Sequence, residues 1–301
     1  MKKWGFLVII VILLSFTIVN KETTLQDSVV IQTDKKMNDE QLDDSKSSES
    51  FQTKSITKES VYKGNLLLVN KKFPVHQGSI KKDVLNLFTH KELTKGYELF
   101  DTNIELSEDV ASKFLKMIIA ANNEGVRHFK INSGFRDFDE QNVLYQQMGS
   151  DYAMPAGRSE HNLGLSLDVG STKMKMNEAP EGKWLANNAW KYGFIIRYPK
   201  DKTQITGIQY EPWHIRYVGL PHSVIMEEKN FSLEEYLDFL KKQKSISTTI
   251  NGEEYKISYY PVRKSTTIQV PTNLHYELSG NNMDGVIVTV FNNSKEDRIA
   301  K

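Results

Sequence analysis

The stretch SEHNLGLSLDVG, residues 159–170, places a histidine and an aspartate seven residues apart with a glycine between them. On one continuous helix, His161 and Asp168 would stand about 10 Å apart along the axis, too far apart to bind one metal ion. After Gly164, however, apolar and polar residues alternate, and this period of two is typical of a short strand. We therefore expect the chain to turn at Gly164 and to bring His161 back over a strand that carries Asp168.

The expected strand has two different faces. Leu165, Leu167 and Val169 should face a core, while Ser166 and Asp168 point the other way. A histidine beside this aspartate can bind a metal ion, because imidazole nitrogens and carboxylate oxygens are zinc ligands. The same two residues can also form a capping or hydrogen-bonding pair in a polar turn, which is the more common arrangement. This stretch alone leaves both interpretations open.

A second stretch, YEPWHIRYVG at residues 210–219, adds a histidine and a glutamate. Pro212 disfavours a regular helix here, and in a flat strand Glu211 and His214 would face opposite sides. Both side chains can address one site only if the chain bends at Pro212 and Trp213. We predict that bend.

Together, the two stretches predict a catalytic zinc site. His161, Asp168 and His214 supply two imidazoles and one carboxylate, which leaves a fourth position on one zinc ion for water. Glu211 need not be a ligand, since it can take a proton from that water and return it to a leaving amine. The alternative is a surface ion pair beside a core histidine, and the joint occurrence of both stretches disfavours it.

Composition limits the classes of protein that this chain can represent. With 301 residues, of which 39% are hydrophobic, it can bury a sizeable core. A net charge of +1 argues against a nucleic-acid-binding surface. The absence of cysteine excludes thiolate metal sites and cysteine nucleophiles, and it suits an exported protein that does not depend on disulfides.

The chain begins with two lysines at positions 2 and 3 and continues with an uncharged apolar run at residues 4–19. We expect this run to be an uncleaved transmembrane signal anchor, with residues 1–3 in the cytoplasm and the remainder outside the cell. A cleaved signal peptide is the main alternative, although no small-residue cleavage site follows the run. A buried core helix of a cytoplasmic protein is a further one.

The rest of the chain divides by composition. Residues 20–60 are polar, charged and without periodicity, which predicts a disordered tether. Residues 61–245 alternate between helix and strand patterns and form the main domain, whereas residues 246–301 predict a β-rich accessory module. The predicted fold class is therefore α+β, a small antiparallel sheet flanked by helices and carrying the zinc site, with the module and the membrane anchor added.

Three motifs in this order resemble those of VanY-type D-alanyl-D-alanine carboxypeptidases, zinc peptidases that act on peptidoglycan precursors. SEHNLGLSLD matches S-x-H-x-x-G-x-x-x-D, EPWHIRYVG matches E-x-W-H-x-R-Y-V-G, and SGFRDFDEQ at residues 133–141 is similar to a third motif, S-G-[YF]-R. The resemblance covers about residues 61–245. The anchor, the tether and the β-rich tail are also similar to VanY proteins of glycopeptide-resistant Gram-positive bacteria.

The resemblance implies roles residue by residue. It assigns zinc to the three ligands named above, general base catalysis to Glu211, and the substrate carboxylate or the developing oxyanion to Arg136. A guanidinium group suits either task, and the start of a helix is an unfavourable place for a purely structural cation. Gln141 and Ser159 match positions that line the substrate pocket, and Tyr198 is a further candidate. Ser159 can alternatively cap a turn.

The implied reaction is removal of the C-terminal D-alanine from peptidoglycan pentapeptide stems on the wall side of the membrane, which would deprive vancomycin-type antibiotics of their target. An L,D-carboxypeptidase or an endopeptidase on the same stems is the alternative, because pocket loops decide the substrate. Glu211 argues against a non-catalytic wall-binding module. Penicillin-binding serine enzymes have S-x-x-K, S-x-N and K-T-G motifs. Ser55 to Lys58 and Ser279 to Asn281 match the first two, but no K-T-G occurs, and we expect Ser55 in the tether.

Overall fold

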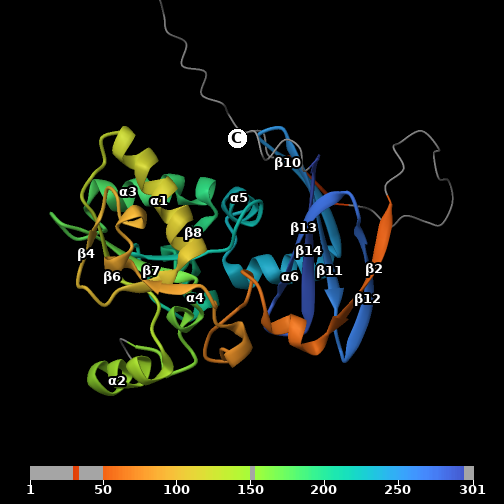
Figure 1. Cartoon of the computed structure of the whole chain (residues 1–301), viewed down its shortest axis with the longest axis horizontal. Helices are drawn as coiled ribbons and strands as arrows, with labels where there is room; N and C mark the ends of the chain where they lie inside the picture. Colours follow the sequence, from red (N-terminus) through yellow and green to blue (C-terminus); the bar gives the residue numbers. More distant parts are fainter. Residues whose placement is uncertain (1–29, 34–49, 150–152, 295–301) are drawn as a thin grey trace, which may run out of the picture.

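A computed structural model describes residues 30–33, 50–149 and 153–294 of the chain (Figure 1). The predicted anchor at residues 4–19 and most of the predicted tether lie outside these residues. Within the described ranges, no helix combines the length and apolar character needed to cross a bilayer.

The first part of the fold is built around a five-stranded sheet that spans residues 98–217. Its strands, in spatial order, are β4 (Glu98–Leu99), β6 (Phe129–Ser133), β7 (Ser166–Ser171), β9 (His214–Tyr217) and β8 (Phe194–Ile196). All neighbours pair antiparallel except β4 and β6, which are parallel. The prediction of an antiparallel sheet is therefore wrong at this edge, because β4 is joined to β6 through a helix rather than by a hairpin.

Helices cover one face of this sheet (Figure 1). They include α1 (Glu108–Asn123) and α3 (Pro180–Asn188), whose apolar residues join one core with the leucines of β7. Ser107 caps α1, its hydroxyl accepting a hydrogen bond from the Val110 amide. Leu165, Leu167 and Val169 are fully buried, so the alternation along β7 leaves Asp168 on the opposite face.

Smaller elements complete this part of the fold. They are β3 (Val84–Asn86), which pairs with β5 (Glu105–Ser107), the helix α2 (Phe138–Met148), the short α4 (Thr203–Thr206) and α5 (His222–Glu228). Residues 65–70, NLLLVN, have the apolar pattern of a strand but form no strand in the structure. Leu67 and Val69 enter the core of the first sheet, whereas Leu66 and Leu68 enter the next core. The continuous apolar pattern of this segment reflects burial on both sides.

The C-terminal part of the chain is β-rich, as predicted for residues 246–301. One antiparallel sheet has the order β1 (Val30–Thr33), β10 (Ser245–Ile250), β11 (Glu253–Pro261), β14 (Gly285–Ser294) and β13 (Leu274–Gly280). The helix α6 (Leu233–Gln243) packs on this sheet, its apolar residues sharing a core with Ile246, Ile257 and Ile287 (Figure 1). The predicted boundary at residue 245 therefore does not separate two cores.

The prediction of a disordered tether is wrong for residues 30–33, which form β1 and pair with β10. It is also wrong for residues 51–57. They form β2 (Phe51–Thr57), which pairs antiparallel with β12 (Ser265–Pro271) over its whole length. Ile56 is 1% exposed and packs in a small core with Val61 and Val262. The strand escapes recognition because its other side chains are mostly exposed and polar, so its sequence lacks an apolar period.

Candidate active site

His161 lies in a short 3-10 helix, η5 (Glu160–Leu163), directly before β7. The Ser159 hydroxyl caps this turn by accepting a hydrogen bond from the His161 amide at 3.3 Å. Gly164 ends it in the left-handed region, at φ +78°, where a side chain would be strained. The predicted turn at Gly164 is confirmed, and it returns His161 to the face of β7 that carries Asp168.

The predicted bend in the second stretch is also present. The amide of His214 donates to the carbonyl of Glu211 at 3.2 Å, and the amide of Glu211 donates to the carbonyl of Tyr198 at 3.1 Å. The strand β9 begins only after this tight turn, at His214. Glu211 and His214 therefore belong to one corner of the chain instead of opposite faces of a strand.

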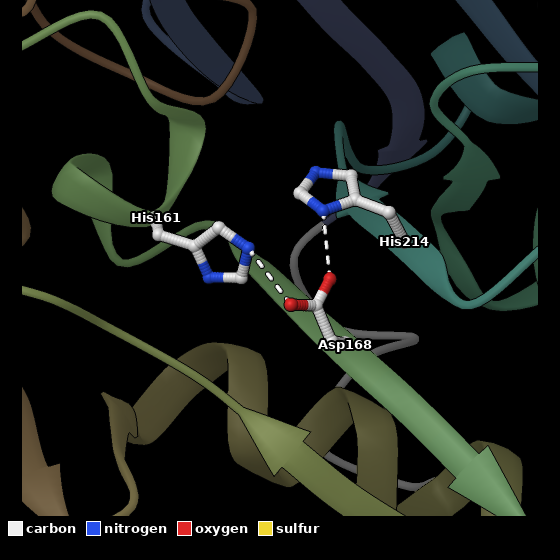
Figure 2. A group of neighbouring side chains, drawn as sticks. All are labelled: His161, Asp168 and His214. Carbon is white, nitrogen blue, oxygen red and sulfur yellow. Dashed lines mark hydrogen bonds and ion pairs between the residues drawn. The ribbon is translucent and has the colours of Figure 1, made fainter. Parts of the chain in front are cut away.

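The two stretches meet through strand pairing, and Figure 2 shows the side chains converging. Nε2 of His161 lies 3.3 Å from Oδ2 of Asp168, and Nδ1 of His214 lies 2.9 Å from Oδ1. One donor atom from each residue lies within 4.8 Å of the other two. Ligands about 2.1 Å from a tetrahedral ion stand roughly 3.4 Å apart, so these residues fit a metal ion.

The two histidines present different nitrogens. Nδ1 of His161 lies 2.6 Å from the carbonyl oxygen of Gly134, which can only accept, so this nitrogen carries the proton and Nε2 is left for a metal. In His214 the order is reversed, since Nδ1 faces Asp168 while Nε2 points to Glu160, 3.7 Å away. Nε2 of His161 and Nδ1 of His214 therefore both face Asp168. A bound metal ion would take the place of a proton on Nδ1 of His214.

The electrostatics of the site favour a cation. Burial alone would lower the pKa of His214, but the hydrogen bond with Asp168 and the negative charges of Asp168 and Glu160 raise it to about 9. Burial would raise the pKa of Asp168, and the two histidines instead hold it well below its usual range. In His161, burial outweighs Asp168 and lowers the pKa. Asp168 is thus ionised and His161 neutral, as metal ligands must be.

Glu211 and Arg136 lie beside this group. Burial is the largest influence on Glu211 and raises its pKa, while His214 and Arg136 act in the opposite direction. Burial lowers the pKa of Arg136, against the attraction of Asp168 and Glu211. The Nε atom of Arg136 is buried without a hydrogen-bond partner among the described residues. The site thus holds a partly desolvated carboxylate and a guanidinium group with a free donor.

The remaining predicted pocket residues have structural contacts. Gln141, in α2, is 1% exposed and donates from Nε2 to the carbonyl of Met154 at 2.6 Å. Ser159 is the cap described above. Tyr198 lies against the ring of His214, with centroids 5.1 Å apart. Of these three, Tyr198 directly contacts a candidate ligand, and Ser159 supports one through the turn.

Sequence reasoning missed a buried ionic cluster behind His214. It consists of Glu160, Arg197, Arg216 and Glu234. The sequence contained two signals of this cluster. Arg197 directly follows the apolar residues 194–196, and Arg216 lies within the strand pattern at residues 214–218. A charge within a buried strand requires a partner of opposite charge.

The serine-enzyme alternative finds no support. Ser55 lies on β2 and Lys58 begins the next short helix, so the expectation that Ser55 lies in a tether is wrong. The hydroxyl of Ser279 accepts from the Leu66 amide and donates to the Gly280 carbonyl. The structure thus gives this hydroxyl a role in joining two segments of backbone.

Two imidazoles and a carboxylate beside a partly buried glutamate define a metal-dependent hydrolase. The sequence model of the VanY family, described as D-alanyl-D-alanine carboxypeptidase, matches residues 103–220 of this chain. A protein from Enterococcus faecium named D-alanyl-D-alanine carboxypeptidase is 61% identical over 293 residues, covering 97% of each chain. The chain therefore belongs to the VanY family of D-alanyl-D-alanine carboxypeptidases and is a metallo-carboxypeptidase.

Solved structures agree with this assignment. The vancomycin resistance D,D-dipeptidase VanXYg, in complex with a D-Ala-D-Ala phosphinate analogue, is similar with a TM-score of 0.70 and 34% identity. The match covers 80% of this chain and 99% of that one. The LD-carboxypeptidase LdcB is similar with a TM-score of 0.50 and 32% identity, over 57% of this chain and 84% of that one.

Proposed function

We propose that this chain removes the C-terminal D-alanine from peptidoglycan pentapeptide stems, with one zinc ion held by His161, Asp168 and His214. The observation that carries the proposal is the convergence of these three donors within 4.8 Å, with Glu211 and Arg136 beside them. Zinc bound in this way would polarise the scissile carbonyl and lower the pKa of a water molecule.

Glu211 is the general base of the proposed reaction. Its carboxylate takes a proton from the attacking water while the water oxygen bonds to the carbonyl carbon. As the peptide C–N bond breaks, Glu211 returns the proton to the leaving amine of D-alanine. The burial that raises the pKa of Glu211 supports this role, since it makes the carboxylate a better proton acceptor.

Arg136 binds negative charge of the substrate. Its buried Nε atom lacks a partner among the described residues, so an incoming carboxylate or oxyanion would satisfy it. The fork of a guanidinium group fits the carboxylate of a terminal D-alanine with two hydrogen bonds. The amide of Arg136 donates to the His161 carbonyl at 3.2 Å, which ties this cation to the ligand-bearing turn.

The relatives support a D-Ala-D-Ala substrate, because the similar Enterococcus faecium protein is named for it and the VanXYg structure holds an analogue of it. Removing this terminus from wall precursors would contribute to resistance against vancomycin-type antibiotics. The similarity to LdcB makes L,D-carboxypeptidase activity on tetrapeptide stems the second candidate.

The substrate is tested by incubating the purified protein with pentapeptide, tetrapeptide and free D-Ala-D-Ala and identifying the released amino acids by mass. We expect one D-alanine from the pentapeptide, released about 10² to 10⁴ times more slowly by the Glu211→Gln variant. Release from the tetrapeptide alone would replace the proposal with the L,D activity.

We further propose that residues 4–19 anchor the protein in the membrane with its catalytic part on the wall side of a Gram-positive cell. The length and apolarity of the run and the lysines before it support this. Cell fractionation should recover the full-length chain with membranes. Recovery from the medium of a chain shortened at its N-terminus would show a cleaved signal instead.

A further inference from the structure

A carboxyl group that is neither a candidate ligand nor the candidate base lies buried behind the metal site. Glu160 is 2% exposed and stands between Ser159 and His161 in the sequence. Its side chain meets two arginines, Arg197 directly after β8 and Arg216 on β9. An ionised carboxylate at such a place is costly unless charged partners compensate it.

Two guanidinium groups provide the compensation. Nε of Arg197 lies 2.8 Å, and Nη1 of Arg216 2.7 Å, from Oε1 of Glu160. Arg197 also donates two hydrogen bonds, of 2.9 and 2.7 Å, to the carboxylate of Glu234 at the start of α6. Burial would raise the pKa of Glu160, but Arg216 and Arg197 lower it far below its usual range. The cluster therefore keeps Glu160 ionised and fixed.

The second oxygen of Glu160 faces a candidate ligand. Oε2 accepts a hydrogen bond from the Ser166 hydroxyl at 3.3 Å and lies 3.7 Å from Nε2 of His214. That nitrogen is buried and has no hydrogen-bond partner in the described part of the chain. On the other side of the ring, Nδ1 faces Asp168 at 2.9 Å. Glu160 is thus placed to act as the hydrogen-bond acceptor for a protonated Nε2 of His214.

We propose that Glu160 is a positioning residue that holds the proton of His214 on Nε2 and turns the Nδ1 lone pair toward the metal. The Gly134 carbonyl does the corresponding work for His161, on the opposite ring nitrogen. The proposal rests on the metal site of the proposed function. Carboxylates that bind the outer nitrogen of a ligand histidine fix its tautomer, and losing them weakens metal binding about 10- to 100-fold.

The test measures zinc affinity by competition with a chromophoric chelator. Glu160→Gln should weaken zinc binding about 10- to 100-fold. Glu234→Gln is the matched control, since it removes a carboxylate of the same cluster that does not face His214. The zinc affinity of this variant should equal that of the wild type. Glu160→Gln leaves two buried arginines with one carboxylate. The double variant Glu160→Gln/Arg197→Gln keeps the charges of the cluster balanced and should show the same loss of zinc affinity.

A measurement on the wild type needs no variant. In the zinc-loaded protein, ¹⁵N NMR should show His214 bound to the metal through Nδ1 and protonated at Nε2. Coordination through Nε2, or folded Glu160 variants that bind zinc as tightly as Glu234→Gln, would overturn the inference. A wild-type protein that binds no zinc would instead overturn the metal site itself, so the two failures are distinguishable.

Discussion

Asp168 and His214 are direct register partners on β7 and β9, although 46 residues separate them, and their side chains meet at 2.9 Å. Two of the three candidate ligands are therefore held by sheet hydrogen bonds, while His161 is held by a capped turn. Sites on regular elements are more rigid than sites on loops. The arrangement should thus exist before metal binds.

Each ligand should be necessary for the metal. The wild type should bind about one zinc ion per chain, whereas His161→Ala, Asp168→Ala and His214→Ala should each lose most of it, because two donors cannot complete the shell. Metal content after gel filtration, measured by atomic emission, checks this. Full zinc occupancy in any one of the three variants would remove that residue from the ligand set.

Glu211→Gln should separate binding from chemistry. The amide keeps the shape of the side chain but cannot accept the proton, so we expect zinc content as in the wild type and a rate about 10² to 10⁴ lower. Parallel measurements of zinc and of D-alanine release test both points. If the variant loses zinc together with activity, Glu211 is a ligand and its assigned role is wrong.

The strand β2 should contribute to stability despite its polar sequence. Ile56→Ala removes a fully buried side chain and should lower the free energy of unfolding by about 2 to 5 kcal/mol. Phe51→Ala on the same strand, where Phe51 is 55% exposed, should change it by no more than about 0.5 kcal/mol. Urea denaturation of both variants gives the comparison. Equal effects would mean that β2 does not pack as described.

His222 should make stability depend on pH. It lies between the Tyr236 hydroxyl and the Thr289 hydroxyl, and burial lowers its pKa to about 3. Between this value and the unfolded pKa of about 6.5, the unfolded chain binds a proton that the folded chain does not. Stability should therefore fall as pH drops below about 6.5, by up to roughly 1.4 kcal/mol per pH unit from this group.

The His222→Gln variant isolates that contribution. Urea unfolding of wild type and variant at about pH 7 and about pH 5 should show a smaller loss of stability in the variant on acidification, because glutamine does not titrate. The same pH dependence in both proteins would mean that folding does not lower the pKa of His222.

Local patterns predicted the parts of the site that depend on local chemistry. The alternation of Leu165, Leu167 and Val169 indicated the strand, Gly164 indicated the turn, and Pro212 indicated the bend that aligns Glu211 with His214. Each of these follows from backbone preferences of a few residues. The meeting of the two stretches could be inferred only from their shared chemistry, because strand pairing is a long-range property.

Long-range contacts explain what the sequence did not reveal. Glu160 shows its role only when β8 and β9 bring Arg197 and Arg216 to it from 37 and 56 residues away. The strand β2 depends on β12, more than 200 residues later, for its pairing. The helix α6 has the pattern of any amphipathic helix, and its place on the C-terminal sheet follows from packing alone.

The central claim is that hydrolysis depends on zinc and not on an acylated serine. The most direct measurement is release of D-alanine from a D-Ala-D-Ala-terminated peptide in the presence of penicillin, then after chelation, and then after zinc is added back. A serine enzyme is acylated by the β-lactam ring, whereas zinc chemistry leaves no side chain acylated. We predict hydrolysis that continues in penicillin, stops on chelation and returns with zinc. Full activity after exhaustive chelation, or a covalent penicillin adduct on the intact protein, would contradict the account.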